Sequence, residues 1–341
     1  MNGLRVALVH RRFTTNGGTE RWVVGFARWL VRQGHAPTVL CNEIRDDLRS
    51  EPGVTFVRLP MLRAFKHVSL WWSARRALAA ASFDVVMGFG RTTGHDVFRA
   101  GGGSHADALR RMYPVRRWVS PKAWVETALD RAAVRGARIC IANSRLGAEG
   151  LRRDYGAQRV EVVYNGVDLE RFRPDPAARA RVRAELGLAR PVACFLGTGF
   201  RRKGLDVAIA ALPDDYTLLV VGGDRPWRAP PRVRFLGSLR DPERVLQGVD
   251  AMILPTRYDP FANACLEALA CGVPALTTPS NGAAEILPFP WMVASDAAGF
   301  RAGLRRAAAG DWSEACRAVA ERHTTEACYG RAFELLREAM G

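Results

Sequence analysis

Two carboxylates stand eight positions apart in a short run of the chain, D-P-F-A-N-A-C-L-E-A-L-A-C-G-V-P at residues 259–274. An apolar strand is expected just before this run, the pair Asp259 and Pro260 is typical of a helix start, and Gly272 is typical of a helix end. Residues eight apart on one helix lie about two turns apart near one face. Asp259 and Glu267 would therefore point toward the same side.

The start of that helix is expected to leave backbone N–H groups free, and a helix N-terminus attracts anions and sugar oxygens. These groups belong to Phe261, Ala262, Asn263 and Ala264. A simpler interpretation stays open for Asp259, because an Asp before Pro is equally typical of a helix N-cap. Glu267 lies among small and apolar neighbours, so it needs a partner or a ligand if the helix is packed on both sides.

Two glycine-containing loops are the next candidates. G-T-G-F-R-R-K-G, residues 197–204, follows a predicted strand and precedes a predicted helix, so Arg202 and Lys203 could hold a diphosphate by charge-assisted hydrogen bonds. The simpler alternative is a basic surface loop in solvent. Gly17 and Gly18 follow the first strand and would let the backbone approach a phosphate or a sugar closely, although two adjacent glycines often make only a turn.

Strand and helix patterns alternate along the chain, which predicts parallel sheets covered by helices on both faces. The alternation restarts after the Arg- and Pro-rich stretch that ends at Pro191, so we expect two doubly wound domains facing a cleft. The predicted boundaries are 1–165, 166–322 and a C-terminal helix in 323–341 that returns to the first domain. Within the first domain, helices are expected over residues 20–32, 68–81 and 121–135.

The composition limits the class of protein and its partners. The 341 residues include 50 Lys and Arg against 34 Asp and Glu, and the formal charge of +16 favours anionic polymers or anionic lipid surfaces. No apolar run reaches the length of about 18 residues that a membrane span needs, so we expect the protein in the cytoplasm. Seven cysteines without a C-x-x-C pair predict neither a disulfide framework nor a zinc site.

Several motifs resemble, in order and spacing, those of retaining GT-B glycosyltransferases of family 4. They are N-G-G-T-E-R, I-A-N-S-R, Y-N-G-V-D, R-R-K-G-L-D, V-V-G-G-D and the carboxylate run, which resembles the E-x7-E signature with Asp259 in place of the first Glu. The resemblance implies a GT-B fold with two Rossmann-like domains and a nucleotide-sugar donor. Glu267 would then bind the ribose, Arg202 and Lys203 the diphosphate, and Asp259 would stand near the donor sugar, with no metal and no cofactor needed.

Within this family the chain looks most similar to lipopolysaccharide-core glucosyltransferases, through G-H-D-V-F-R-A-G-G-G-S-H-A-D-A-L-R. This resemblance favours UDP-glucose as donor and a glycolipid such as a growing lipopolysaccharide core as acceptor. The position of an Asp in those enzymes aligns with Gly102 here. We therefore expect His105, ahead of His95, to be the catalytic group facing the donor sugar, although a lone histidine is often only a structural residue.

The segment from Arg110 to Arg138 carries eight basic residues against only Glu126 and Asp130, with Trp118 and Trp124 interleaved. Basic charge and Trp both favour an anionic lipid surface. We therefore expect a peripheral protein on the cytoplasmic face of the inner membrane. Two alternatives stay open: a soluble GT-B sugar-nucleotide enzyme, an epimerase or a polysaccharide synthase, and a non-catalytic module that binds nucleic acid. The carboxylates in the expected cleft speak against nucleic acid.

Overall fold

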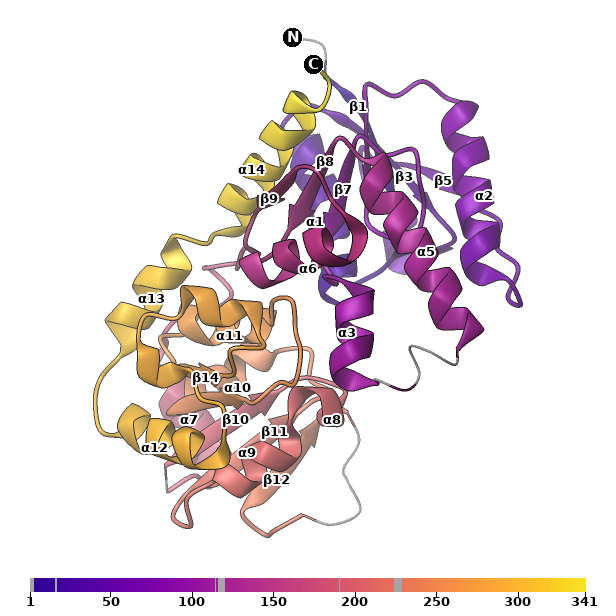
Figure 1. Cartoon of the computed structure of the whole chain (residues 1–341). Coiled ribbons are helices and arrows are strands. Elements are labelled where there is room, and N and C mark those ends of the chain that lie inside the picture. The colour runs from indigo at the N-terminus through magenta and orange to yellow at the C-terminus, as the bar shows by residue number, and fades with distance from the viewer. Residues whose placement is uncertain (1–2, 16, 114, 116–119, 190, 224–228) are drawn as a thin grey trace. The chain divides into compact units, whose positions relative to one another are not determined.

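The computed structural model describes residues 3–15, 17–113, 115, 120–189, 191–223 and 229–341. The chain divides into two compact units (Figure 1). The first unit combines Met1–Tyr164 with Cys328–Gly341, and the second unit is Asn165–Ala327.

The first unit is built on a sheet of seven strands in the order β5-β3-β1-β6-β7-β8-β9, and every neighbouring pair is parallel. The strands are β1 (Arg5–Val9), β3 (Ala36–Cys41), β5 (Thr55–Arg58), β6 (Val85–Gly88), β7 (Val97–Ala100), β8 (Ile139–Ala142) and β9 (Val160–Val162). Strand order reverses between β1 and β6. Ligands of such sheets bind outside the carboxyl ends of the strands at that reversal.

Helices cover the sheet of the first unit, with two short strands beside it, β2 (Arg12–Phe13) and β4 (Glu43–Ile44). The helices are α1 (Gly18–Arg32), α2 (Lys66–Ala79), α3 (His105–Met112), α5 (Pro121–Gly136), α6 (Arg145–Tyr155) and the C-terminal α14 (Thr325–Glu338). From α14, Tyr329 packs edge-on against Trp22 of α1, and Leu335 and Leu336 lie in the same core. The end of the chain is therefore part of the first unit's core.

The second unit repeats the plan with five strands in the order β12-β11-β10-β13-β14, again parallel throughout. The strands are β10 (Val192–Leu196), β11 (Thr217–Val221), β12 (Val233–Gly237), β13 (Ala251–Leu254) and β14 (Ala275–Thr277). The helices are α7 (Pro176–Glu185), α8 (Phe200–Lys203), α9 (Leu205–Ala211), α10 (Pro242–Gly248), α11 (Asn263–Ala270), α12 (Ala297–Ala308) and α13 (Ser313–Glu321). Here the strand order reverses between β10 and β13.

The described residues also limit what else the chain holds. All seven cysteines are free and buried, and burial raises the pKa of six of them, Cys41 and Cys194 among these, to about 12. Their thiols are therefore core groups. No described helix is long and apolar enough to cross a membrane. In the same part of the chain, no group of three or more His, Cys, Asp or Glu side chains could hold a metal ion.

Candidate active site

The basic loop of the second unit is fastened to the carboxyl edge of its sheet. It leaves β10, forms the short helix α8 and turns at Gly204, which has a φ of 77°. A Cβ at this glycine would lie 2.0 Å from the carbonyl oxygen of Pro255, so no other residue fits without movement. The Arg202 carbonyl accepts hydrogen bonds from the Thr256 hydroxyl at 3.0 Å and the Arg257 N–H at 2.8 Å. These contacts hold Arg202 and Lys203 beside the end of β13.

Both basic side chains converge on Asp259. One carboxylate oxygen, Oδ2, accepts from Arg202 Nη1 at 2.6 Å and from Lys203 Nζ at 2.7 Å. The Lys203 and Asp259 side chains are each only 10% exposed, whereas Arg202 is 41% exposed. Burial alone would raise the pKa of Asp259, but the charges of Lys203 and Arg202 outweigh it and the pKa lies below its ordinary value. The site is thus a charged cluster in which one carboxylate pairs with two cations.

The prediction that Asp259 begins the following helix is wrong. Helix α11 begins at Asn263, and Asp259 instead forms a parallel bridge with Asn281. The Phe261 N–H donates to Asp259 Oδ1 at 3.2 Å, and the Ala262 N–H donates to Asn281 Oδ1 at 3.0 Å. These two side-chain acceptors hold the chain extended past Pro260, which delays the helix.

The expected set of free N–H groups is smaller for the same reason. Phe261 and Ala262 use theirs within the protein, whereas the N–H groups of Asn263 and Ala264 have no hydrogen-bond acceptor within the described residues. Glu267 lies half-buried on α11, whereas Asp259 precedes this helix. The two carboxylates therefore do not share a helix face. Arg171 Nη2 donates a hydrogen bond to the Glu243 carboxylate, which raises the pKa of Arg171, and the charge of Glu267 adds a smaller contribution.

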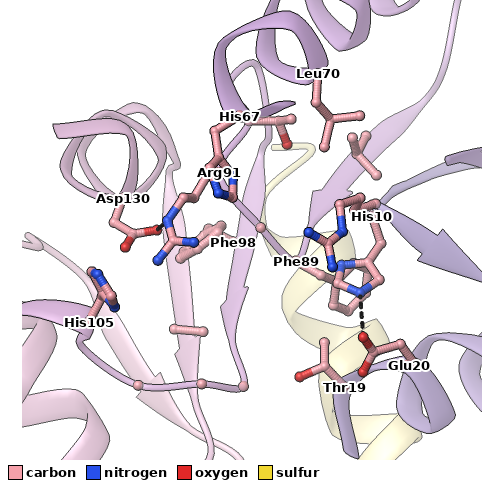
Figure 2. A pocket seen from close by; sticks show the side chains of 18 of the residues that line it. His10, Thr19, Glu20, His67, Leu70, Phe89, Arg91, Phe98, His105 and Asp130 are labelled. Carbon is pink, nitrogen blue, oxygen red and sulfur yellow. Dashed lines mark ion pairs between the residues drawn. The ribbon is translucent and has the colours of Figure 1, made fainter. Parts of the chain in front are cut away.

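The first unit has a pocket of its own, with a volume of about 360 Å³. It opens at the carboxyl ends of β1, β5, β6 and β7, where the reversal of strand order predicts a ligand site. His105 and Asp130 lie on one side of it, His10 and Glu20 on the other, and Arg91 and His67 between them (Figure 2). The rings of Phe89 and Phe98 and the backbone of residues 101–103 complete the lining. The pocket therefore combines aromatic faces with side chains of both charges.

Glu126 of α5 organises the polar side of this pocket. Its carboxylate lies 2.9 Å from His67 Nε2, 3.2 Å from His105 Nε2 and 3.9 Å from Arg91 Nη1. One turn further along, Asp130 Oδ1 lies 3.2 Å from Arg91 Nε. Burial raises the pKa of Asp130 to about 6, although Arg91 acts against it.

The sequence argument missed this arrangement. It treated Glu126 and Asp130 only as two acids within a basic segment. The available signal was their spacing of four residues, which places both on one face of a helix, here the face turned toward the pocket.

The remaining predicted residues are two histidines and two glycines, and only some of them line the pocket. His105 is the first residue of α3 and lines the pocket, whereas His95 is 4% exposed and does not. His95 Nε2 lies 2.9 Å from the Thr92 hydroxyl, and burial lowers the pKa of this histidine to about 4, so it is a neutral core residue. Gly17 caps α1 with a φ of 123°, and Gly18 is the first residue of that helix. Both glycines belong to the first unit, whereas the basic cluster belongs to the second.

Two family profiles match this chain. Residues 16–171 match the profile of Glycosyltransferase Family 4, and residues 190–309 match that of Glycosyl transferases group 1. A "Probable transglycosylase" of Burkholderia thailandensis is 31% identical over 309 residues, which are 85% of this chain and 83% of that protein. The chain belongs to glycosyltransferase family 4.

Two solved structures show the same fold as this glycosyltransferase. WaaG, a glycosyltransferase involved in lipopolysaccharide biosynthesis, matches with a TM-score of 0.83 over 97% of this chain and 99% of its own, at 20% identity. HepE of Anabaena, solved in complex with UDP-glucose, matches with a TM-score of 0.78 over 98% of this chain and 100% of its own, at 16% identity. The predicted family and the predicted GT-B fold are confirmed, and neither alternative function is favoured.

Proposed function

We propose that the enzyme transfers a sugar, with retention and without a metal ion, from UDP-glucose or a similar nucleotide sugar to a glycolipid acceptor such as a lipopolysaccharide core. The cluster of Arg202, Lys203 and Asp259 at the carboxyl edge of the second sheet carries the proposal. Two similar structures support it, because HepE was solved with UDP-glucose and WaaG is involved in lipopolysaccharide biosynthesis.

In this proposal the second unit binds the donor. The diphosphate accepts hydrogen bonds from Arg202 and Lys203, and these cations stabilise the negative charge that develops on the leaving diphosphate. Glu267 accepts hydrogen bonds from the ribose hydroxyls. The N–H groups of Asn263 and Ala264 orient hydroxyls of the donor sugar. Asp259 fixes both cations and stands near that sugar.

The pocket of the first unit receives the acceptor. Its aromatic rings offer apolar faces to a sugar ring, while Glu20, Asp130 and the histidines offer hydrogen-bond partners to its hydroxyls. His105 is the proposed catalytic group that contacts the reacting sugar, and Glu126 orients it. We also propose that the enzyme works as a peripheral protein on the cytoplasmic face of the inner membrane, through residues 110–138. Arg116, Arg117 and Trp118 of this segment lie outside the described residues, whereas Lys122, Trp124, Arg131 and Arg135 are exposed.

Calorimetry with UDP, after a thermal-shift screen of nucleotide sugars, tests the donor site. Glu267→Ala should remove roughly 2–4 kcal/mol of UDP affinity, since each hydrogen bond to a charged group contributes about 1.5–3 kcal/mol. Arg202→Ala should weaken UDP much more than uridine, because its proposed partner is the diphosphate. Glu314→Ala, at an exposed position of α13, is the matched control and should bind normally. Unchanged UDP binding in both test variants would overturn the donor site.

A further inference from the structure

The large apolar side chains that the described residues expose are concentrated on the first unit. Leu239 is such a residue in the second unit and Met340 lies at the chain end, but the others fall in two short segments, 62–72 and 113–125. They are Leu62, Phe65, Val68 and Trp72 in the first segment, and Tyr113, Val115, Trp124 and Val125 in the second. Scattered exposed apolar residues need no explanation, but a concentration of them marks an interaction surface.

Helix α2 presents apolar side chains on the face that a surface helix normally leaves polar. Phe65, Val68 and Trp72 follow one another at spacings of three and four, which aligns them on one face, and they are 68%, 45% and 54% exposed. Leu70 and Ala74 of the opposite face are buried in the unit. The helix is therefore apolar on both faces, and one of these faces has no partner within the described residues of the first unit.

The apolar turn before α2 is held in place by hydrogen bonds. The Ser69 hydroxyl accepts from the Leu62 N–H at 3.0 Å and donates to the Phe65 carbonyl at 2.9 Å, and the Phe65 N–H donates to the Leu62 carbonyl at 3.2 Å. Farther along the helix, the Arg76 guanidinium lies 4.7 Å from the centre of the Trp72 ring. The fold itself thus presents Leu62 and Phe65 to the outside.

The two apolar segments adjoin each other. His67 near the start of α2 contacts Glu126 near the start of α5 at 2.9 Å, and the starts of the two helices lie side by side (Figure 1). The exposed apolar side chains on the α2 side are Leu62, Phe65, Val68 and Trp72, which we call the α2 stripe, and those at the start of α5 are Trp124 and Val125. The same two helices and the turn before α2 also carry exposed basic residues: Arg63, Arg75, Arg76, Lys122 and Arg131.

We propose that the α2 stripe is the second half of a membrane-binding face, whose apolar side chains enter the headgroup layer of an anionic bilayer while the exposed arginines of the same segment contact lipid phosphates. The combination of Trp, Phe and Leu with Lys and Arg is typical of interfacial membrane binding. A second copy of the chain would bring like charges together, whereas an anionic bilayer supplies the opposite charge. The inference rests on the proposed function in one respect, the lipid-bound acceptor.

The position of the face supports such an acceptor. Leu59, His67 and Leu70 line the pocket of the first unit, and the apolar turn lies between Leu59 and His67 in the chain. A lipid held at the turn would therefore place its headgroup close to the pocket. Residues 110–138 alone would not hold a lipid at this turn, since the turn belongs to another part of the chain.

Binding to vesicles of phosphatidylglycerol and phosphatidylethanolamine, measured by flotation, tests the proposal. The double variant Phe65→Ser, Trp72→Ser should bind roughly tenfold more weakly or worse, because two large apolar side chains no longer enter the lipid. Leu239→Ser, Met340→Ser removes two exposed apolar side chains elsewhere and should bind like the wild type. Arg75→Gln, Arg76→Gln should lose binding to anionic vesicles only, against the control Arg181→Gln, Arg240→Gln, which changes exposed arginines of the second unit.

Two outcomes would overturn the proposal. The first is vesicle binding by the Phe65, Trp72 double variant that equals that of the Leu239, Met340 control. The second is a wild-type dimer, detected by light scattering, that the double variant abolishes while lipid binding persists, because the face would then be an interface between copies. UDP calorimetry on the Phe65, Trp72 double variant distinguishes a failure of the membrane proposal from a failure of the donor site. Neither of its two substitutions contacts the cluster of Arg202, Lys203 and Asp259, so UDP binding should be normal.

Discussion

The two units share one plan, a parallel sheet with a site at its carboxyl edge, but they build their sites differently. The second unit joins two short segments, residues 200–204 and 256–263, around one buried ion cluster. The first unit gathers its pocket from the ends of four strands and the helices α1, α2, α3 and α5. Local motifs therefore specify the second site, whereas long-range packing specifies the first.

The pKa shifts of the charged groups also differ between the two sites. In the second unit, the charges of Lys203 and Arg202 hold the pKa of Asp259 below its ordinary value, so this carboxylate stays charged around neutral pH. In the first unit, the pKa of Asp130 is raised to about 6, and burial, followed by the charge of Arg91, lowers the pKa of His67. Fixed charge suits a diphosphate, whereas groups that titrate near neutrality suit the hydroxyls of a sugar. Each difference can be tested by substitution.

Among the charged side chains of the two sites, the largest effect is expected at Lys203. Lys203→Met should lower the free energy of unfolding by about 3 kcal/mol, because it leaves Asp259 buried with Arg202 as its remaining partner. Urea unfolding measures this loss. The double variant Lys203→Met, Asp259→Asn removes both charges and should recover most of the stability. If the single and double variants are equally unstable, the pair is not the coupled unit described here.

Much of the second unit was predictable because its signals are local. The glycines and the basic pair form one motif within residues 197–204, and the apolar run of β13 leads to Asp259 as a second motif. The contact between Arg202 and Asp259 joins the two motifs across 57 residues. The start of α11 was not predictable in this way. It depends on Asn281, which lies 18 residues beyond Asn263 and occupies the Ala262 N–H from a separate segment.

The first unit was predictable only as a fold. The alternation of apolar strands predicts its sheet, but the pocket depends on which helix side chains reach it. Glu126 approaches His67 and His105 across 59 and 21 residues of sequence, and no local pattern announces these contacts. The interior position of His95 likewise follows from packing beneath Gly88, where an added Cβ would lie 2.2 Å from the imidazole ring.

A second prediction concerns pH and uses Asp130. Its folded pKa of about 6 lies above the ordinary value of 3.8, so the folded state binds the proton more tightly. This contribution to stability is complete below about pH 4 and is lost as the pH rises through 6, which amounts to about 3 kcal/mol. Wild-type stability should therefore fall relative to Asp130→Asn between pH 4 and pH 7. Parallel stability profiles of the two proteins would contradict this.

A third and smaller effect is expected at Glu126. Glu126→Gln keeps the shape but removes the charge that holds His67, His105 and Arg91, and should cost about 1–2 kcal/mol of stability. If the proposed function holds, the KM for the acceptor should rise while UDP affinity measured by calorimetry stays unchanged. Glu149→Gln, on the exposed side of α6, is the control. Loss of UDP affinity in Glu126→Gln would show that the two sites are not separable.

The smallest effect is expected at Gly102, and the same substitution in the other unit sharpens the comparison. A Cβ added to Gly102 meets no atom within 4 Å, and this glycine is not among those with a positive φ, so Gly102→Asp should change the free energy of unfolding by less than about 0.5 kcal/mol. Gly204→Asp should be severely destabilising, because it forces a left-handed backbone on an Asp and places its Cβ 2.0 Å from the Pro255 carbonyl.

Gly102→Asp would also add to the pocket the carboxylate that the resemblance to lipopolysaccharide-core enzymes places at this position. Transfer assays on Gly102→Asp, His105→Ala and their combination would then show whether a carboxylate there can replace His105. Equal stability losses at the two glycines would contradict the view that the first site tolerates change and the second does not.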